Sequence, residues 1–109
     1  MNPILVITNL PDKETALRLA EKLISKKLAA CVNVQAKSTS FYRWQDKIEA
    51  TNELPIFIKT LAPHYNEVEN TIKEIHPDEL PEIITVPING GLPAYLQWIL
   101  DETAISNKN

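Results

Sequence analysis

The sequence from His76 to Ile88 reads HPDELPEIITVPI and holds three prolines within thirteen residues. Pro77 predicts that the helical pattern before it ends there, because proline disfavours helical backbone at the preceding residue and cannot continue the hydrogen-bond ladder. Pro81 and Pro87 bracket residues 82–86, whose β-branched side chains predict an extended strand that is largely buried. This stretch therefore closes a helix and lays down a core strand.

Glu82 is the one charged residue in that strand, directly before its apolar run. A carboxylate there is either exposed at the start of the strand or paired with a cation. Lys59 ends an earlier predicted strand, and both residues could lie near one rim of the sheet or face a neighbouring subunit. Both interpretations of Glu82, exposed or paired with Lys59, stay open at this point.

Composition predicts one globular domain over residues 1–109, because 44% of the residues are hydrophobic and 23% are charged. The net charge is −3 and the lysines are dispersed, so nucleic acid is not an expected partner. Only two glycines occur, Gly90 and Gly91, which excludes the Gly-rich phosphate loops of P-loop and Rossmann proteins. No organic cofactor is expected.

The single cysteine, Cys31, cannot form an intrachain disulfide, and the sequence MNPILVITNLP lacks the basic and apolar regions of a signal peptide. We therefore expect a cytoplasmic protein. No apolar run approaches the roughly 20 residues that span a bilayer, so no membrane association is expected.

Hydrophobic periodicity predicts the other elements. Asp12 suits the N-cap of the first helix, Pro63 and Pro93 suit the first positions of two later helices, and the tail 105–109 is expected to fray. The elements are a strand at 4–7, a helix at 14–26, a strand at 28–34, a hairpin over 38–60, a helix from 63 to 75, the strand at 82–86 and a helix from 93. This order predicts an α+β fold, a ferredoxin-like split βαβ sandwich with a long β-hairpin and an extra C-terminal helix.

The predicted hairpin turns at Gln45, Asp46 and Lys47. With arms of about 13 residues at about 3.3 Å each, it reaches on the order of 40 Å, more than one small domain covers. Its far part carries Phe41, Tyr42 and Trp44, for which we expect cover on another subunit.

Five motifs in this order resemble the CutA divalent-cation-tolerance proteins: LAACVNV (28–34), S-x-Y-x-W (40–44), Glu53 followed by IKT (58–60), HPDELPEII (76–84) and YLQW (95–98). The resemblance covers nearly the whole chain. It implies a ferredoxin-like protomer, a homotrimer built through the long hairpins, kinship to the PII signal proteins, and a link to copper and other divalent cations. In animal members it also implies a link to membrane anchoring of acetylcholinesterase.

Three departures from that family pattern concern the hairpin turn, residue 78 and the cysteines. Asp46 stands where glycine is usual, and aspartate tolerates a left-handed turn position. Asp78 replaces an aromatic residue and offers a hard oxygen ligand. The extra cysteines of some members, near the first strand and the second helix, are absent here.

The candidate metal ligands are Cys31, His76, Asp78 and Glu82, with Glu79 beside them. Imidazole and carboxylates suit Zn or Cu(II), and a thiolate suits Cu(I), so we expect copper or another divalent cation, weakly bound. The alternatives are a buried, inert Cys31 and a His76 that caps a helix amid dispersed acids. His64 is expected to be exposed.

A second set of residues could meet in an intersubunit cleft of a trimer and bind a small molecule: Tyr42, Trp44, Glu53, Lys59, Glu82, Tyr95 and Trp98. The alternative is packing within the trimer. No motif joins a nucleophile to a base and an orienting group, so an enzyme is not expected. The sequence thus predicts a homotrimer that binds divalent metal in a tolerance role, or else a PII-like sensor of an organic metabolite.

Overall fold

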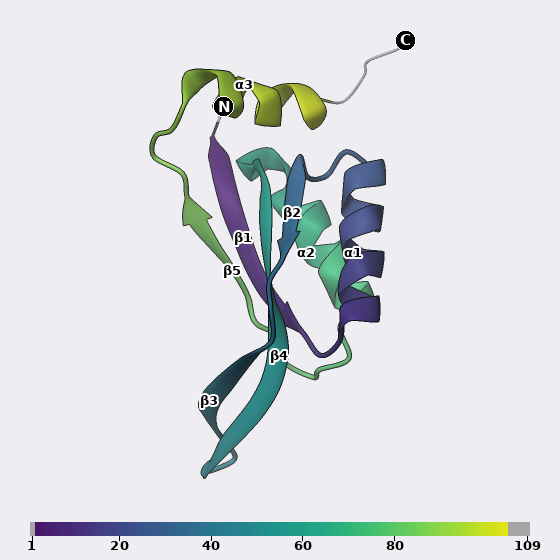
Figure 1. The fold of residues 1–109 in the computed structure, drawn as a ribbon, viewed down its shortest axis with the longest axis vertical. Helices are drawn as coiled ribbons and strands as arrows, with labels where there is room; N and C mark the ends of the chain where they lie inside the picture. Colours follow the sequence, from purple (N-terminus) through teal and green to yellow (C-terminus); the bar gives the residue numbers. More distant parts are fainter. Residues whose placement is uncertain (1, 105–109) are drawn as a thin grey trace.

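Five β-strands, three α-helices and a short 3-10 helix form residues 2–104, the part that the computed structural model describes (Figure 1). The predicted fraying of 105–109 lies outside the described residues. In chain order the elements are β1 (Pro3–Leu10), α1 (Lys13–Ser25), β2 (Cys31–Val34), β3 (Ser38–Trp44), β4 (Lys47–Leu61), η1 (Ala62–His64), α2 (Tyr65–Ile75), β5 (Ile83–Pro87) and α3 (Pro93–Glu102). Among these residues no helix is long and apolar enough to cross a membrane.

The sheet has the order β2-β4-β1-β5, with every neighbouring pair antiparallel. Two β-α-β units, β1-α1-β2 and β4-α2-β5, therefore interleave in one sheet, and the predicted α+β class is confirmed. Helices α1 and α2 lie side by side on one face, while α3 lies across the end of the sheet (Figure 1).

The core lies between the sheet and these two helices. Residues alternate strictly between buried and half-buried along β1, so Ile4, Val6, Thr8 and Leu10 face the helices. Alternate side chains of a strand point to opposite faces, so the other four face away from α1 and α2. The buried hydrophobic residues of the helices that meet this sheet are Ala16, Leu19, Leu23, Val68 and Ile72.

Helix α1 begins with the predicted cap. Asp12 accepts a hydrogen bond of 2.8 Å from the Thr15 backbone N–H, which satisfies one of the free donors at the helix start. This bond holds the pKa of the Asp12 carboxyl below its usual value, because it stabilises the charged form.

The β3–β4 hairpin projects from the sheet and helps to give the molecule its longest dimension, 51 Å (Figure 1). Gln45 and Asp46 form its tip with φ values of 50° and 65°, as the tight turns of two-residue hairpins require. Asp46 therefore adopts the left-handed conformation in place of the usual glycine. Pro55 lies within the central strand β4, where pairing passes from β2 to β3.

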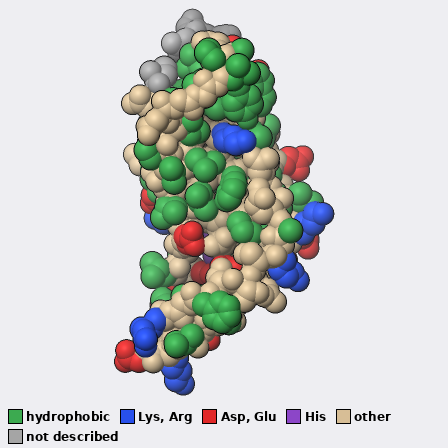
Figure 2. Space-filling model, turned by 60° about the vertical axis from the view of Figure 1, so that its left-hand side comes forward, with side chains coloured by type: hydrophobic (Ala, Val, Ile, Leu, Met, Phe, Trp, Pro, Cys, Tyr) green, Lys and Arg blue, Asp and Glu red, His purple; other side chains and the backbone are tan. Residues whose placement is uncertain are grey.

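Strand β5 corrects the expectation of a buried core strand. Among residues 2–104 it pairs only with β1 and is an edge strand, and Ile84 and Val86 are 47% and 41% exposed. The error arose because a β-branched run predicts a strand but does not say how many neighbours it has. Figure 2 shows hydrophobic side chains gathered over the middle of the surface on this side of the molecule.

His64 was also predicted wrongly as exposed, since only 7% of it is accessible. The predicted helix start is split into η1 and then α2, so that His64 turns inward at their junction.

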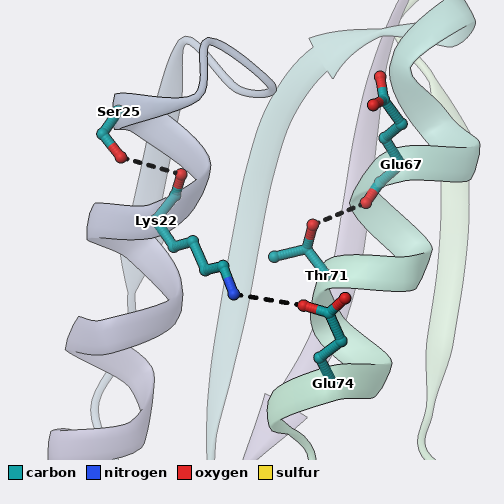
Figure 3. Close-up of polar contacts among 5 residues, drawn as sticks. All are labelled: Lys22, Ser25, Glu67, Thr71 and Glu74. Carbon is teal, nitrogen blue, oxygen red and sulfur yellow. Dashed lines mark hydrogen bonds and ion pairs between the residues drawn. The ribbon is translucent and has the colours of Figure 1, made fainter.

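An ion pair joins the outer surfaces of α1 and α2, where Lys22 Nζ lies 3.2 Å from Glu74 Oε1 (Figure 3). Both side chains are well exposed, so we expect a double-mutant cycle of Lys22→Met and Glu74→Gln to give a coupling energy of only about 0–1 kcal/mol. Urea unfolding at 0.1 M and 1 M salt measures it. A coupling of several kcal/mol that persists at high salt would contradict this surface assignment.

Candidate functional site

A cavity of about 720 Å³ lies at the base of the hairpin, between β3, the adjoining part of β4 and the segment 76–82. Its position is visible in Figure 2 as a hollow with acidic side chains, just above the projecting hairpin. The residues that line it are Asn9, Ser40, Phe41, Tyr42, Arg43, Trp44, Glu53, His76, Asp78, Glu79, Leu80 and Glu82.

His76 fastens the end of α2 to the end of β1. Its Nδ1 accepts a hydrogen bond of 3.1 Å from the Asp78 backbone N–H, so the ring proton is on Nε2. Nε2 lies 2.6 Å from the Asn9 carbonyl oxygen and donates to it. Both ring nitrogens of His76 therefore form hydrogen bonds within the protein. His76 thus has a structural role at the cavity wall, where it links the segment after α2 to the end of β1.

Glu82 lies beside the same strand end. Its Oε1 accepts a hydrogen bond of 2.7 Å from Asn9 Nδ2, while Lys59 lies four positions further along the β1–β4 register, opposite Leu5. Of the two alternatives for Glu82, pairing with Lys59 is therefore not found within one chain. Glu82 is an exposed carboxylate at the start of β5, oriented by an amide.

The proposed metal ligands divide between two places. His76, Asp78 and Glu82 line the cavity, whereas Cys31 lies on β2 opposite Lys59, with Sγ 3.7 Å from Asn33 Oδ1. Across residues 2–104, no three His, Cys, Asp or Glu side chains are arranged to hold a metal ion. Cys31 thus does not join the other three.

The residues proposed for the ligand cleft also lie in two separate places. Tyr42, Trp44, Glu53 and Glu82 line the cavity at the hairpin. The others form a second cluster, in which Lys59 Nζ lies 5.7 Å from the centroid of the Tyr95 ring and the Tyr95 and Trp98 rings are 5.5 Å apart. Since α3 and the hairpin lie at opposite ends of the molecule (Figure 1), one chain does not combine the two groups.

Asn9 is the site residue that the sequence reasoning missed. Its carbonyl holds His76 and its amide holds Glu82, so it organises one wall of the cavity. A polar residue just before the end of an apolar strand was the available signal, because strand ends often carry functional groups. Ser40, Arg43 and Leu80 also line the cavity and were not predicted as site residues, although Ser40 belongs to the S-x-Y-x-W motif.

The sequence of this chain matches a known protein family and several of its members. Residues 4–102 match the family described as CutA1 divalent ion tolerance protein. The chain is 36% identical over 103 residues to the divalent-cation tolerance protein CutA of Thermus thermophilus, covering 94% of this chain and 99% of that protein.

Solved structures agree. The crystal structure of CutA1 from Oryza sativa superposes with a TM-score of 0.92 at 37% identity, covering 97% of each chain. The structure of the periplasmic divalent cation tolerance protein CutA from Archaeoglobus fulgidus gives 0.90 at 36% identity, covering 94% of this chain and 99% of that one. The chain spans 60%, 56% and 55% of the curated relatives from Xenopus laevis, Oryza sativa and Mus musculus, which are longer.

Proposed function

Because the chain belongs to the CutA1 divalent ion tolerance family, we propose that it acts in cation tolerance as a homotrimer that binds divalent cations, such as copper, weakly. Membership of this non-enzymatic family also confirms the prediction that the chain is not an enzyme. The single observation that carries cation binding is that His76, Asp78 and Glu82 all line one cavity.

We expect a weak affinity for metal ions because both ring nitrogens of His76 already form hydrogen bonds. An incoming cation needs a free ring nitrogen, and it obtains one only by displacing the Asp78 N–H or the Asn9 carbonyl. Nδ1 is the more accessible choice, because its partner lies in the exposed segment after α2. The imidazole and the two carboxylates are donor types that together suit Zn or Cu(II).

Replacing His76 with alanine is expected to weaken Zn(II) or Cu(II) binding by at least about tenfold, since loss of even an outer-shell partner commonly costs 10–100-fold. Isothermal titration calorimetry of the apo protein measures this. Cys31→Ser is the control and is expected to change uptake of Cu(I) alone. Unchanged isotherms in both variants would rule out this metal site.

Two features support the homotrimer. The sheet face away from α1 and α2 presents Ile84 and Val86 to solvent, and the hairpin carries Phe41, Tyr42 and Trp44 outward. Covering such apolar surface favours association. Sedimentation equilibrium is expected to give about three times the chain mass of 12.3 kDa. A monomer at micromolar concentration would contradict the proposal.

The second candidate is a PII-like sensor of an organic metabolite, favoured by one observation, the aromatic and acidic lining of the cavity. Native mass spectrometry of the protein as isolated separates the two functions, because a retained organic ligand supports the sensor and bound metal supports the first. We propose the cytoplasm as the compartment from the lone cysteine. The names of relatives include periplasmic and chloroplastic proteins.

A further inference from the structure

We propose that a second cavity, between the C-terminal end of α1 and the first turns of α2, binds a short zwitterion with a carboxylate at one end and an ammonium group at the other. The cavity measures about 500 Å³, within the roughly 300–1,000 Å³ of small-molecule sites. Lys26 and Lys27 line it from the end of α1, and His64, Glu67 and Asn70 line it from η1 and α2.

This cavity lies on the helical face of the molecule. Helices α1 and α2 cover one face of the sheet (Figure 1), whereas the apolar surfaces that favour association lie on the opposite face and on the hairpin. Figure 3 shows Glu74, which lines the cavity, joined to Lys22 of α1, with Thr71 and Glu67 nearer the start of α2. A trimer built through the other surfaces therefore leaves this cavity open.

His64 is the observation that indicates a ligand. Only 7% of it is exposed, it forms no side-chain cap for α2, and the hydrogen bonds of histidine rings within residues 2–104 all belong to His76. In the same part of the chain, the one fully enclosed side-chain oxygen or nitrogen without a partner is Thr8 Oγ1, so the ring nitrogens of His64 are open to the cavity. A buried polar ring gains free energy from a hydrogen-bond partner, which a ligand in this cavity supplies.

Charges of opposite sign line the cavity from different elements. Lys26 and Lys27 belong to the end of α1, and Glu67 belongs to the first turn of α2. The two ion pairs within residues 2–104 join other side chains, so neither lysine pairs with Glu67. A zwitterion satisfies both signs, because its carboxylate meets the lysines and its ammonium group meets Glu67 in charge-assisted hydrogen bonds. A simple anion or cation would meet one unfavourable charge.

The backbone holds Lys27 beside the cavity in an unfavourable conformation. Helix α1 ends in a Schellman motif, in which the Lys27 N–H donates to the Ile24 carbonyl at 3.0 Å and the Leu28 N–H donates to the Leu23 carbonyl at 2.9 Å. Lys27 has a φ of 59°, at the position where glycine is usual. A lysine that is kept there despite the backbone cost supports a role for its side chain.

The test uses the two histidines of the chain, His64 and His76, which lie in different cavities and report separately in one NMR spectrum. The ligand tested is 5-aminopentanoate, and the matched controls are pentanoate and 1-aminopentane, each of which lacks one of its charges. At constant pH and ionic strength, 5-aminopentanoate is expected to shift the ring signals of His64 saturably and to leave those of His76 unchanged. It is expected to bind at least about tenfold more tightly than either control, since each control loses a charge-assisted contact.

Three results overturn the proposal. The first is the absence of a saturable shift of His64 with 5-aminopentanoate. The second is equal binding of either control, which shows a simple anion or cation site. The third is a shift of His76 alone, which places the ligand at the hairpin base. Metal binding is measured separately through His76→Ala, so the failure of either proposal leaves the other standing.

Variants locate the two charges. Lys27→Gly is expected to weaken binding of 5-aminopentanoate by about tenfold or more, while the thermal midpoint holds or rises because glycine suits the left-handed conformation. Glu67 and Glu14 are both exposed in the first turn of a helix, but only Glu67 lines the cavity. Glu67→Gln is expected to weaken binding about as much, and Glu14→Gln to leave it unchanged. Equal effects of the two glutamine variants, or full binding by Lys27→Gly, contradict the assignment.

Discussion

Replacing Ile58 with alanine is expected to lower the free energy of unfolding by about 2–5 kcal/mol, the usual cost of truncating a fully buried isoleucine. Ile58 is 0% exposed on the central strand β4, where it lies opposite Val6 of β1 and Val32 of β2. Deleting its side chain removes packing between the sheet and the helices and leaves a cavity. Urea unfolding at fixed protomer concentration measures the change, because subunit association would add to the apparent stability.

Ile48 provides the control within the same strand. It lies near the tip of the hairpin and is 74% exposed, so Ile48→Ala is expected to change the unfolding free energy by less than about 0.5 kcal/mol in the free chain. Equal losses in the two variants would show that burial within one chain does not govern the effect. A loss at Ile48 that appears only at high protomer concentration would instead place the hairpin tip in a subunit contact.

Thr60→Val is expected to cost about 1–3 kcal/mol, while Thr8→Val is expected to be neutral or stabilising. Both threonines are fully buried on neighbouring central strands. The Thr60 hydroxyl donates to the Leu28 carbonyl at 2.7 Å, whereas Thr8 Oγ1 is buried without a hydrogen-bond partner among the described residues. Valine leaves the Leu28 carbonyl without this donor in the first case and removes an unsatisfied oxygen in the second.

Parallel thermal and urea unfolding of the two valine variants measures the difference. Because the substitutions are identical in shape and both sites are buried, the difference between them isolates the hydrogen bond. Similar destabilisation of both would mean that the Thr8 hydroxyl has a partner after all, for example a buried water.

Local signals were sufficient to predict most elements. Asp12 caps α1, Pro93 opens α3, and the apolar alternation of β4 continues through Pro55, because capping, proline geometry and periodicity depend on neighbours in sequence. The predicted burial of β5 and the predicted exposure of His64 were wrong. Their exposure depends on which strands pair and on where a 3-10 turn replaces the first helical turn, and both are decided by contacts between distant residues.

The same distinction between local signals and long-range contacts applies to the residues of the candidate site. His76, Asp78 and Glu82 are close in sequence, and proximity alone predicted that they share a wall. Lys59 and Cys31 were grouped with the site because their types suited the chemistry, but the sheet register places them opposite each other and away from it. Register is set by long-range pairing, which a single sequence does not specify.

Pro81 and Pro87, which lie before and at the end of β5, have a consequence for solubility. An edge strand offers unpaired backbone groups to any other chain, and an exposed apolar edge is a template for fibres. Here that edge is only five residues long, from Ile83 to Pro87, and Pro87 has no N–H to donate. Pro81 lies two residues before the strand and also lacks an N–H, so the strand cannot be lengthened at its N-terminal end with an unbroken series of hydrogen-bond donors. The prolines that make the strand recognisable in the sequence therefore also protect the protein against open-ended strand addition, so that any pairing along this edge must stay short and end within a few hydrogen bonds.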